Sequence, residues 1–133
     1  MEIDLTARGD EFRAFWTERR LASLTTVRAD GTPHVVAVGV TVDFEAGVAR
    51  VITFADSHKA RVTRDGTGDG VAAAVCQVDG PRWSTLEGRM ILRDDEESVR
   101  DAENRYAQRY RQPRPNPKRV VLEIAIKRVL GNA

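Results

Sequence analysis

Segments rich in β-branched residues recur along almost the whole chain, and they constrain its fold more than any other feature. In most of them apolar and polar side chains alternate, which is typical of strands with one buried face. Turn sequences such as Asp30-Gly31 and Gly80-Pro81 separate several of them. We expect the first three strands to form a meander. The pattern predicts six strands, over residues 21–28, 33–44, 48–54, 70–79, 82–95 and 119–131.

Three segments break this pattern and show helical spacing instead, namely residues 10–20, 56–66 and 96–112. Asp10 is the expected N-cap of the first helix, and Asp56 or Ser57 is that of the second. The third helix must end at the prolines that follow it. Six strands with three helical insertions predict one α+β domain, residues 1–133, built on an antiparallel barrel.

Composition and charge exclude several classes of protein. The 21 Lys and Arg residues nearly balance the 20 Asp and Glu residues, so we expect no nucleic-acid or membrane-surface binding. The longest apolar runs fall short of the roughly 20 residues that a membrane span needs. With no apolar signal segment at the N-terminus, we expect a soluble cytoplasmic protein. One cysteine and two histidines without spaced partners predict no disulfide and no metal site.

The most informative segment for chemistry is residues 53–61, where a strand ends and a helix begins. Thr53, Ser57 and the free backbone N–H groups of a helix start could bind an anion, and Lys59 would add a point charge. A solvated helix start with ordinary surface bases explains these residues equally well. His34, near a turn at the start of a long strand, is a second candidate, although such a histidine is more often a packing or surface group.

Longer stretches resemble a known family. The segments LASLTTVRADGTPHVVAVG, RVITFADSHKARVTR and RWSTLEGR, in this order, resemble flavin and deazaflavin oxidoreductases related to pyridoxamine 5′-phosphate oxidase. The resemblance covers residues 21–130 and implies a six-stranded antiparallel split β-barrel. The stretches VCQVDGPRWSTLEGR and RDAENRYAQRYRQPRPNPKRVVLEIAIKRVLG resemble the branch of actinobacterial biliverdin reductases that use coenzyme F420. That branch implies hydride transfer from reduced F420 to biliverdin, in a homodimer with cofactor sites between the subunits.

The resemblance also implies site residues, all of them in cofactor binding, with no catalytic nucleophile and no metal ligand. They are His34, Val35, Val36, Ala37, Val38, Thr53, Ser57, His58, Lys59, Arg61 and Trp83. Lys59 matches the phosphate-binding lysine of the family. Two positions depart from the pattern of the flavin enzymes: His58 stands in place of an arginine, and Trp83 in place of a glutamine. Both departures predict that F420 binds more tightly than FMN.

Two alternatives remain open at this point. One is an FMN-binding oxidase or reductase of the same fold, and the other is a non-catalytic module that binds a flavin or a tetrapyrrole. A substrate with two propionates would need arginines, and residues 105–114 offer several. The chain has many apolar strands, and the first helix adds Phe15 and Trp16. We expect that a monomer would leave part of this apolar surface exposed, which favours a homodimer.

Overall fold

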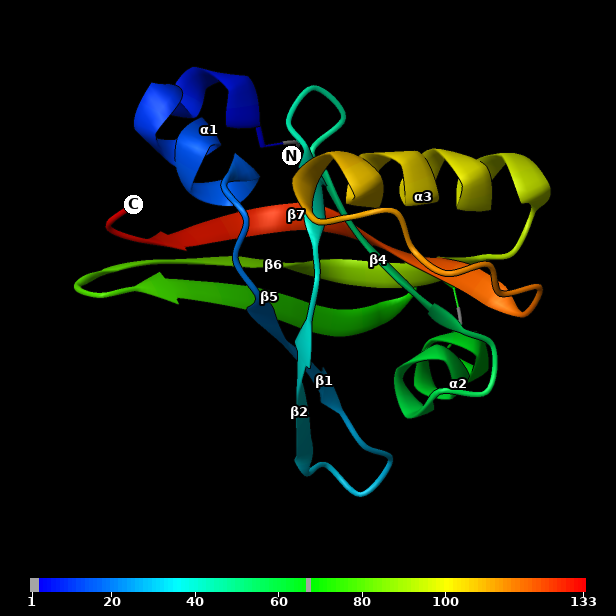
Figure 1. Ribbon diagram of the computed structural model, residues 1–133. Coiled ribbons are helices and arrows are strands. Elements are labelled where there is room, and N and C mark those ends of the chain that lie inside the picture. The colour runs from blue at the N-terminus through cyan, green and yellow to red at the C-terminus, as the bar shows by residue number, and fades with distance from the viewer. Residues whose placement is uncertain (1–2, 67) are drawn as a thin grey trace.

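The computed structural model describes residues 3–66 and 68–133 and contains one strongly curled antiparallel sheet with helices packed around it (Figure 1). The strands are β1 (Ala22–Val27), β2 (Pro33–Val38), β3 (Thr41–Asp43), β4 (Val48–Phe54), β5 (Val71–Asp79), β6 (Arg82–Arg93) and β7 (Arg119–Gly131). The helices are the 3-10 turn η1 (Leu5–Arg8), α1 (Asp10–Thr17), α2 (His58–Asp65) and α3 (Glu96–Arg109). None of the described helices is long and apolar enough to cross a membrane.

The predicted strand over residues 33–44 is wrong, because the chain breaks there into β2 and β3. At Gly39 the backbone passes so close to α3 that a Cβ would lie 2.8 Å from Cε2 of Tyr106. The next residue, Val40, donates its backbone N–H to the hydroxyl of Tyr110 (3.0 Å). Aromatic side chains of α3 thus occupy the place where the strand would continue, and the sheet has seven strands instead of six.

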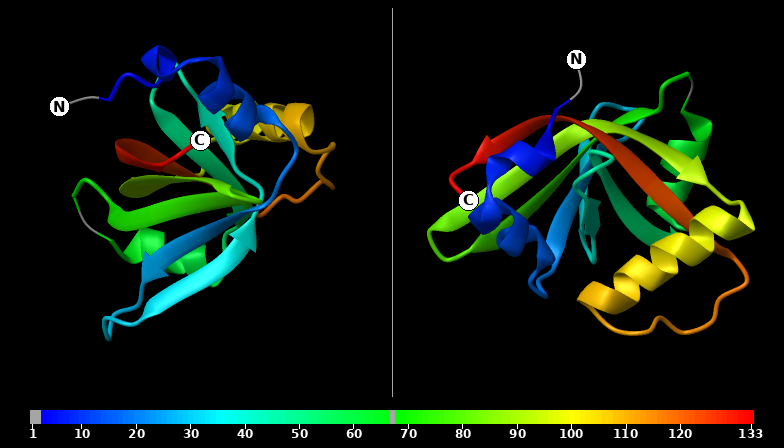
Figure 2. Two further views of the ribbon diagram at one scale, coloured as in Figure 1. Left: turned by 90° about the vertical axis from the view of Figure 1, so that its left-hand side faces the viewer. Right: turned by 90° about the horizontal axis from the view of Figure 1, so that it is seen from above.

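The predicted meander of the first three strands is also wrong. In the strand order β2-β1-β5-β6-β7-β4-β3, the strands β2 and β3 lie at opposite ends of the sheet. The first two strands form one hairpin and β3 with β4 another, while the second neighbour of β4 is β7. The short link between β2 and β3 therefore joins the two edges of the sheet. Figure 2 shows how the β1–β2 hairpin splays away from the remaining strands.

The hydrophobic core lies on the inner face of the sheet, and α1 covers one end of it. Phe15 and Trp16 of this helix are 0% and 1% exposed, and the indole N–H of Trp16 donates to Oγ of Ser84 (3.0 Å). They therefore leave no apolar surface exposed, contrary to the expectation that they favour a dimer. The helix is capped by Gly9 instead of Asp10, which lies in its first turn.

A β-bulge at Gly88 interrupts the regular pairing of β6 with β7. The register between β6 and β7 shifts at Glu87 and Gly88. A Cβ at Gly88 would lie 1.9 Å from the carbonyl oxygen of Ala125, so no side chain fits there. The bulge lets two long strands bend together, which helps the sheet to curl.

A buried arginine connects the end of α3 to three other parts of the fold. The guanidinium of Arg109 donates to the carbonyl oxygens of Glu18 and Val40 and to Oε1 of Gln77, at 2.6 to 3.0 Å. The amide of Gln77 in turn donates to the carbonyl of Phe15 (2.5 Å). No carboxylate among the described residues pairs with Arg109, and burial lowers the pKa of this guanidinium.

Candidate functional site

The turn from β4 to α2 has the predicted form of a strand end followed by a capped helix. Ser57 is the N-cap, and its Oγ accepts the backbone N–H of Ala60 (3.1 Å). The hydroxyl of Thr53 donates to the same Oγ (3.0 Å). Both hydroxyls therefore hold the turn in shape, and Lys59 is left as the charged group at the start of the helix.

Lys59 is half-buried, and its ammonium has no hydrogen-bond or ion-pair partner among residues 3–66 and 68–133. Burial lowers the pKa of its ammonium below the ordinary value, since no neighbouring carboxylate compensates for the lost hydration. An anion that binds beside it would restore this compensation. The geometry thus favours the anion-binding interpretation of this turn over an ordinary solvated helix start.

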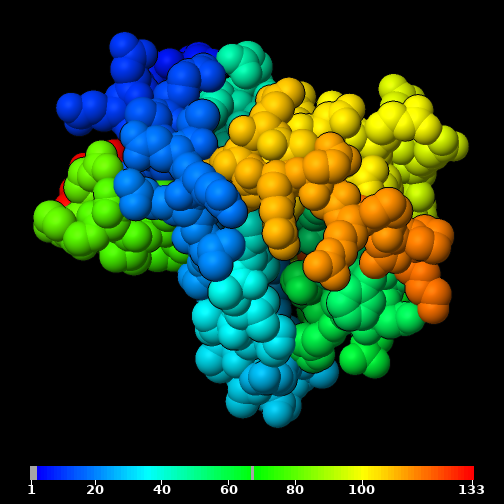
Figure 3. Space-filling model, viewed as in Figure 1, coloured from blue at the N-terminus to red at the C-terminus, as the bar shows by residue number. Residues whose placement is uncertain are grey.

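Lys59 faces a cavity of about 390 Å³ between β2, β4, α2 and the segment that follows α3. Figure 3 shows the hollow, which is bordered by β2 in cyan, α2 in green and the segment after α3 in orange. Its walls include three consecutive residues where β2 ends, three residues at the end of β4, and four basic side chains. These residues are Ala37, Val38, Gly39, Ile52, Thr53, Phe54, Lys59, Arg111, Arg114 and Arg119. No acidic residue lines the cavity within the described chain.

The two histidines of the chain lie against each other beside this cavity. The ring centroids of His34 on β2 and His58 on α2 are 4.3 Å apart, with the rings tilted by 43°. Nδ1 of His34 and Nε2 of His58 are buried and have no hydrogen-bond partner in the described chain. Burial lowers the pKa of His34, and the neighbouring His58, Arg28 and Lys59 lower it further.

The structure brings some of the predicted site residues together and leaves others apart. Ala37, Val38, Thr53 and Lys59 line one cavity, with Ser57 fixing the turn beneath them. The two histidines lie where β2 meets α2, and Val35 and Val36 belong to a shallow groove along β1 and β2.

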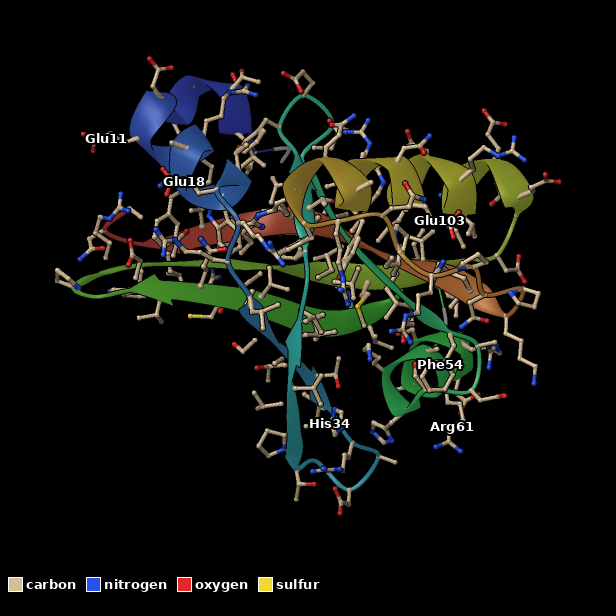
Figure 4. All side chains as sticks on the ribbon, viewed as in Figure 1. Glu11, Glu18, His34, Phe54, Arg61 and Glu103 are labelled. Atoms are coloured by element: carbon tan, nitrogen blue, oxygen red, sulfur yellow. The ribbon has the colours of Figure 1, made fainter. Side chains whose placement is uncertain are left out.

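Arg61 and Trp83 do not line the cavity of the described chain. Arg61 is exposed on α2 (Figure 4). Trp83 lies next to the β5–β6 turn, at the end of the sheet far from α2 (Figure 1). The assignment of these two residues to a cofactor site remains a prediction.

Sequence reasoning missed part of the cavity wall. Gly39 was considered only as part of a flat apolar wall, and Tyr106 as a residue that could stack on a planar ligand or simply pack, so neither was in the predicted cofactor-binding set. Arg111 and Arg114 were only part of a longer basic stretch. Aromatic and glycine residues at the ends of elements carry no signal of their own. Their place in the wall follows from the packing of α3 on the β2–β3 link.

The chain is similar to known proteins over nearly its whole length. The family model described as pyridoxamine 5′-phosphate oxidase matches residues 9–133. The chain belongs to this family. One relative of the chain is the F420H(2)-dependent biliverdin reductase of Mycobacterium tuberculosis (strain CDC 1551 / Oshkosh). It is 57% identical over 132 residues, which cover 98% of this chain and 93% of that protein.

Solved structures confirm the α+β split-barrel fold of the pyridoxamine 5′-phosphate oxidase family. A conserved hypothetical protein from Mycobacterium tuberculosis superposes with a TM-score of 0.76 at 23% identity, over 98% of this chain and 88% of its own. A protein described as an F420 reductase gives a TM-score of 0.69 at 21% identity, over 92% and 98% of the two chains. At these identities the likeness shows the fold alone.

Proposed function

We propose that this protein is an F420H2-dependent reductase that converts biliverdin to bilirubin. The observation that carries the proposal is the 57% identity to the mycobacterial biliverdin reductase over nearly the full length of both chains. At that identity and coverage the residues around a cavity are expected to be largely shared. The cavity beside Lys59 supports the proposal because it offers an unpaired cation next to a wall of small residues.

The described residues fit a deazaflavin cofactor. Lys59 and the backbone N–H groups at the start of α2 would hold its phosphate, and Thr53 and Ser57 keep that helix start in place. Ala37 presents little side chain, so a flat ring system can lie close to the backbone at the end of β2. When bound, a reduced deazaflavin supplies a hydride. We expect the chain to bind and orient the two ligands and to need no covalent nucleophile.

We also propose a homodimer, formed through the outer face of the sheet. The strand pairings place Val35, Thr25, Ala74, Val78 and Trp83 on one face. Val35 is 59% and Val78 is 63% exposed, and Thr25 and Ala74 of the same face line a cavity of about 420 Å³ together with residues of β6 and β7. An exposed apolar face of this extent favours association. In such a dimer Trp83 would lie near the cofactor site of the partner subunit, which would explain why it is far from Lys59 of its own chain.

We expect this enzyme to work in the cytoplasm. Its single cysteine fits a reducing compartment, where structural disulfides are rare. Chemistry that consumes a reduced cofactor also needs a compartment that regenerates it.

The direct test is a titration of the purified protein with F420 and with FMN, followed by a turnover assay. With reduced F420 present, we expect the visible absorption band of biliverdin to be replaced by that of bilirubin. We also expect F420 to bind more tightly than FMN. The reverse order of affinities would favour an FMN enzyme, and binding of both ligands without turnover would favour a non-catalytic module.

A further inference from the structure

Two arginines at the mouth of the cavity have no assigned role. Arg111 and Arg114 are exposed, line the cavity, and make no side-chain hydrogen bond or ion pair with any described residue. Other arginines of the same region are already engaged. Arg105 pairs with Asp101 and Asp43, and the side chain of Arg119 pairs with Glu103. The unpaired charge at the mouth is therefore concentrated on two side chains.

The backbone that carries these two arginines is held in place although their side chains are free. The guanidinium of Arg119 donates to the carbonyl oxygen of Arg114 (2.8 Å), while the same side chain pairs with Glu103 on α3. The backbone N–H of Arg119 donates to the carbonyl of Asn116 (3.1 Å). A segment fixed at both ends presents its charges at a defined position. Its backbone therefore loses less conformational entropy when a ligand binds.

The cavity thus has cations on two sides. Lys59 lies at the start of α2, and Arg111 with Arg114 lies on the segment after α3, with the end of β2 between them. A lysine ammonium suits a phosphate as a point charge, whereas the planar guanidinium suits the two oxygens of a carboxylate. The difference in chemistry between the two sides indicates two kinds of anion in one cavity.

We propose that Arg111 and Arg114 bind carboxylate groups of a ligand in this cavity and so select for acidic ligands. The inference rests on the proposed function and extends it to named residues. Two ligands of that function carry such groups, namely the tetrapyrrole with its propionates and the cofactor with its acidic tail. The chemistry is shared, and the experiment separates the two sources.

The test uses the double variant Arg111→Gln/Arg114→Gln, with Arg100→Gln as the matched control. Arg100 is an exposed arginine of α3 that pairs with Glu96 and does not line the cavity. Equilibrium binding to the F420-loaded protein is measured for biliverdin and for its dimethyl ester. Binding to the free protein is measured for F420 and for the deazaflavin riboside, which lacks the acidic tail.

If the arginines hold the propionates, the double variant binds biliverdin roughly tenfold more weakly and the dimethyl ester as well as the parent does. If they hold the cofactor tail, the roughly tenfold loss appears for F420 and is absent for the riboside. Arg100→Gln changes none of these constants.

Unchanged dissociation constants for all four ligands overturn the proposal, and so does an equal loss for biliverdin and its ester. A parent protein that binds neither F420 nor biliverdin refutes the proposed function itself. That result is visible before any variant is made, and it removes the basis of the carboxylate assignment as well.

Discussion

Lys59 combines partial burial, a position in the first turn of α2 and the absence of a carboxylate partner in the described chain. A buried ammonium without a counter-ion is unfavourable for the protein alone, because the charge has lost part of its hydration. The same feature becomes favourable once an anionic ligand binds. We therefore place the largest single effect on cofactor affinity at this residue.

Replacing Lys59 with Ala should weaken the binding of F420 roughly tenfold to a hundredfold, because a charge-assisted hydrogen bond contributes about 1.5–3 kcal/mol. Turnover at saturating cofactor should change little, since the residue would contact the phosphate and not the reacting ring. The measurement is calorimetric titration of both proteins. Lys118→Ala, an exposed lysine outside the cavity, serves as the control. Equal affinity of the Lys59 variant and the parent would place the phosphate elsewhere.

The protonation of His34 should couple the stability of the protein to pH. Burial, His58, Arg28 and Lys59 all lower the pKa of His34 from its ordinary 6.5. Below that pH the unfolded chain binds more protons at this residue than the folded chain, so stability falls as the pH decreases through 6.5 toward the lowered value.

A His34→Asn variant should therefore lose less stability than the parent when the pH falls from about 7.5 to about 5. Urea unfolding at a series of pH values gives the two slopes. Parallel curves for variant and parent would mean that His34 titrates alike in the folded and unfolded states.

Individual site residues were predictable only where one segment contains the whole signal. Ser57 and Lys59 follow a strand at the spacing of a capped helix, so the sequence pattern could locate them. The contact between His34 and His58 depends on β2 meeting α2 in space, and no local pattern reports it. Arg111 resembled any other arginine of a basic stretch until the fold separated the paired side chains from the unpaired ones.

At the scale of elements, the end of α3 depends on Arg109. Its guanidinium satisfies the carbonyls of Glu18 and Val40 together with the side chain of Gln77. Tyr106, one helical turn before it, and Arg111, two residues after it, line the cavity. A change at this buried residue should therefore affect both the stability of the fold and the shape of the site.

Arg109→Met should lower the free energy of unfolding by roughly 2–4 kcal/mol, because two buried acceptors and one partly buried acceptor lose this donor. Arg109→Lys, which can reach some of them, should lose less. Both values follow from urea unfolding. Arg105→Met on the same helix, which removes only partly exposed ion pairs, should cost about 1 kcal/mol or less. A loss at Arg109 no larger than at Arg105 would show that this network contributes little.

The positions of most elements could be predicted from periodicity and capping residues, but the break between β2 and β3 could not. Residues 33–44 are uniformly suitable for a strand, and only the aromatic side chains of a helix far along the chain interrupt them. The pairing of β4 with β7 is likewise a property of the whole sheet. Local patterns report the tendency of a segment and carry no information about its distant neighbours.

At the scale of the whole molecule, the exposed apolar face of β1, β2 and β5 should be covered by a second copy of the chain. We expect sedimentation equilibrium at micromolar concentration to give a dimer. Val78→Arg places a charge on this face and should shift the equilibrium toward monomer. Glu97→Arg, at an exposed position on α3, should leave the dimer intact. A monomeric parent protein would rule out the dimer.

The order of the strands has a consequence for synthesis on the ribosome. β4 is complete at Phe54, but the strand that pairs with its inner edge, β7, begins only at Arg119. During translation the edge of β4 that pairs with β7 therefore stays unpaired until almost the whole chain has emerged. Such a delay exposes a β-rich edge to other nascent chains. Pairing of β4 with β7 is a slow, non-local step of folding. A chaperone that binds the nascent chain would therefore prevent aggregation mainly before this step.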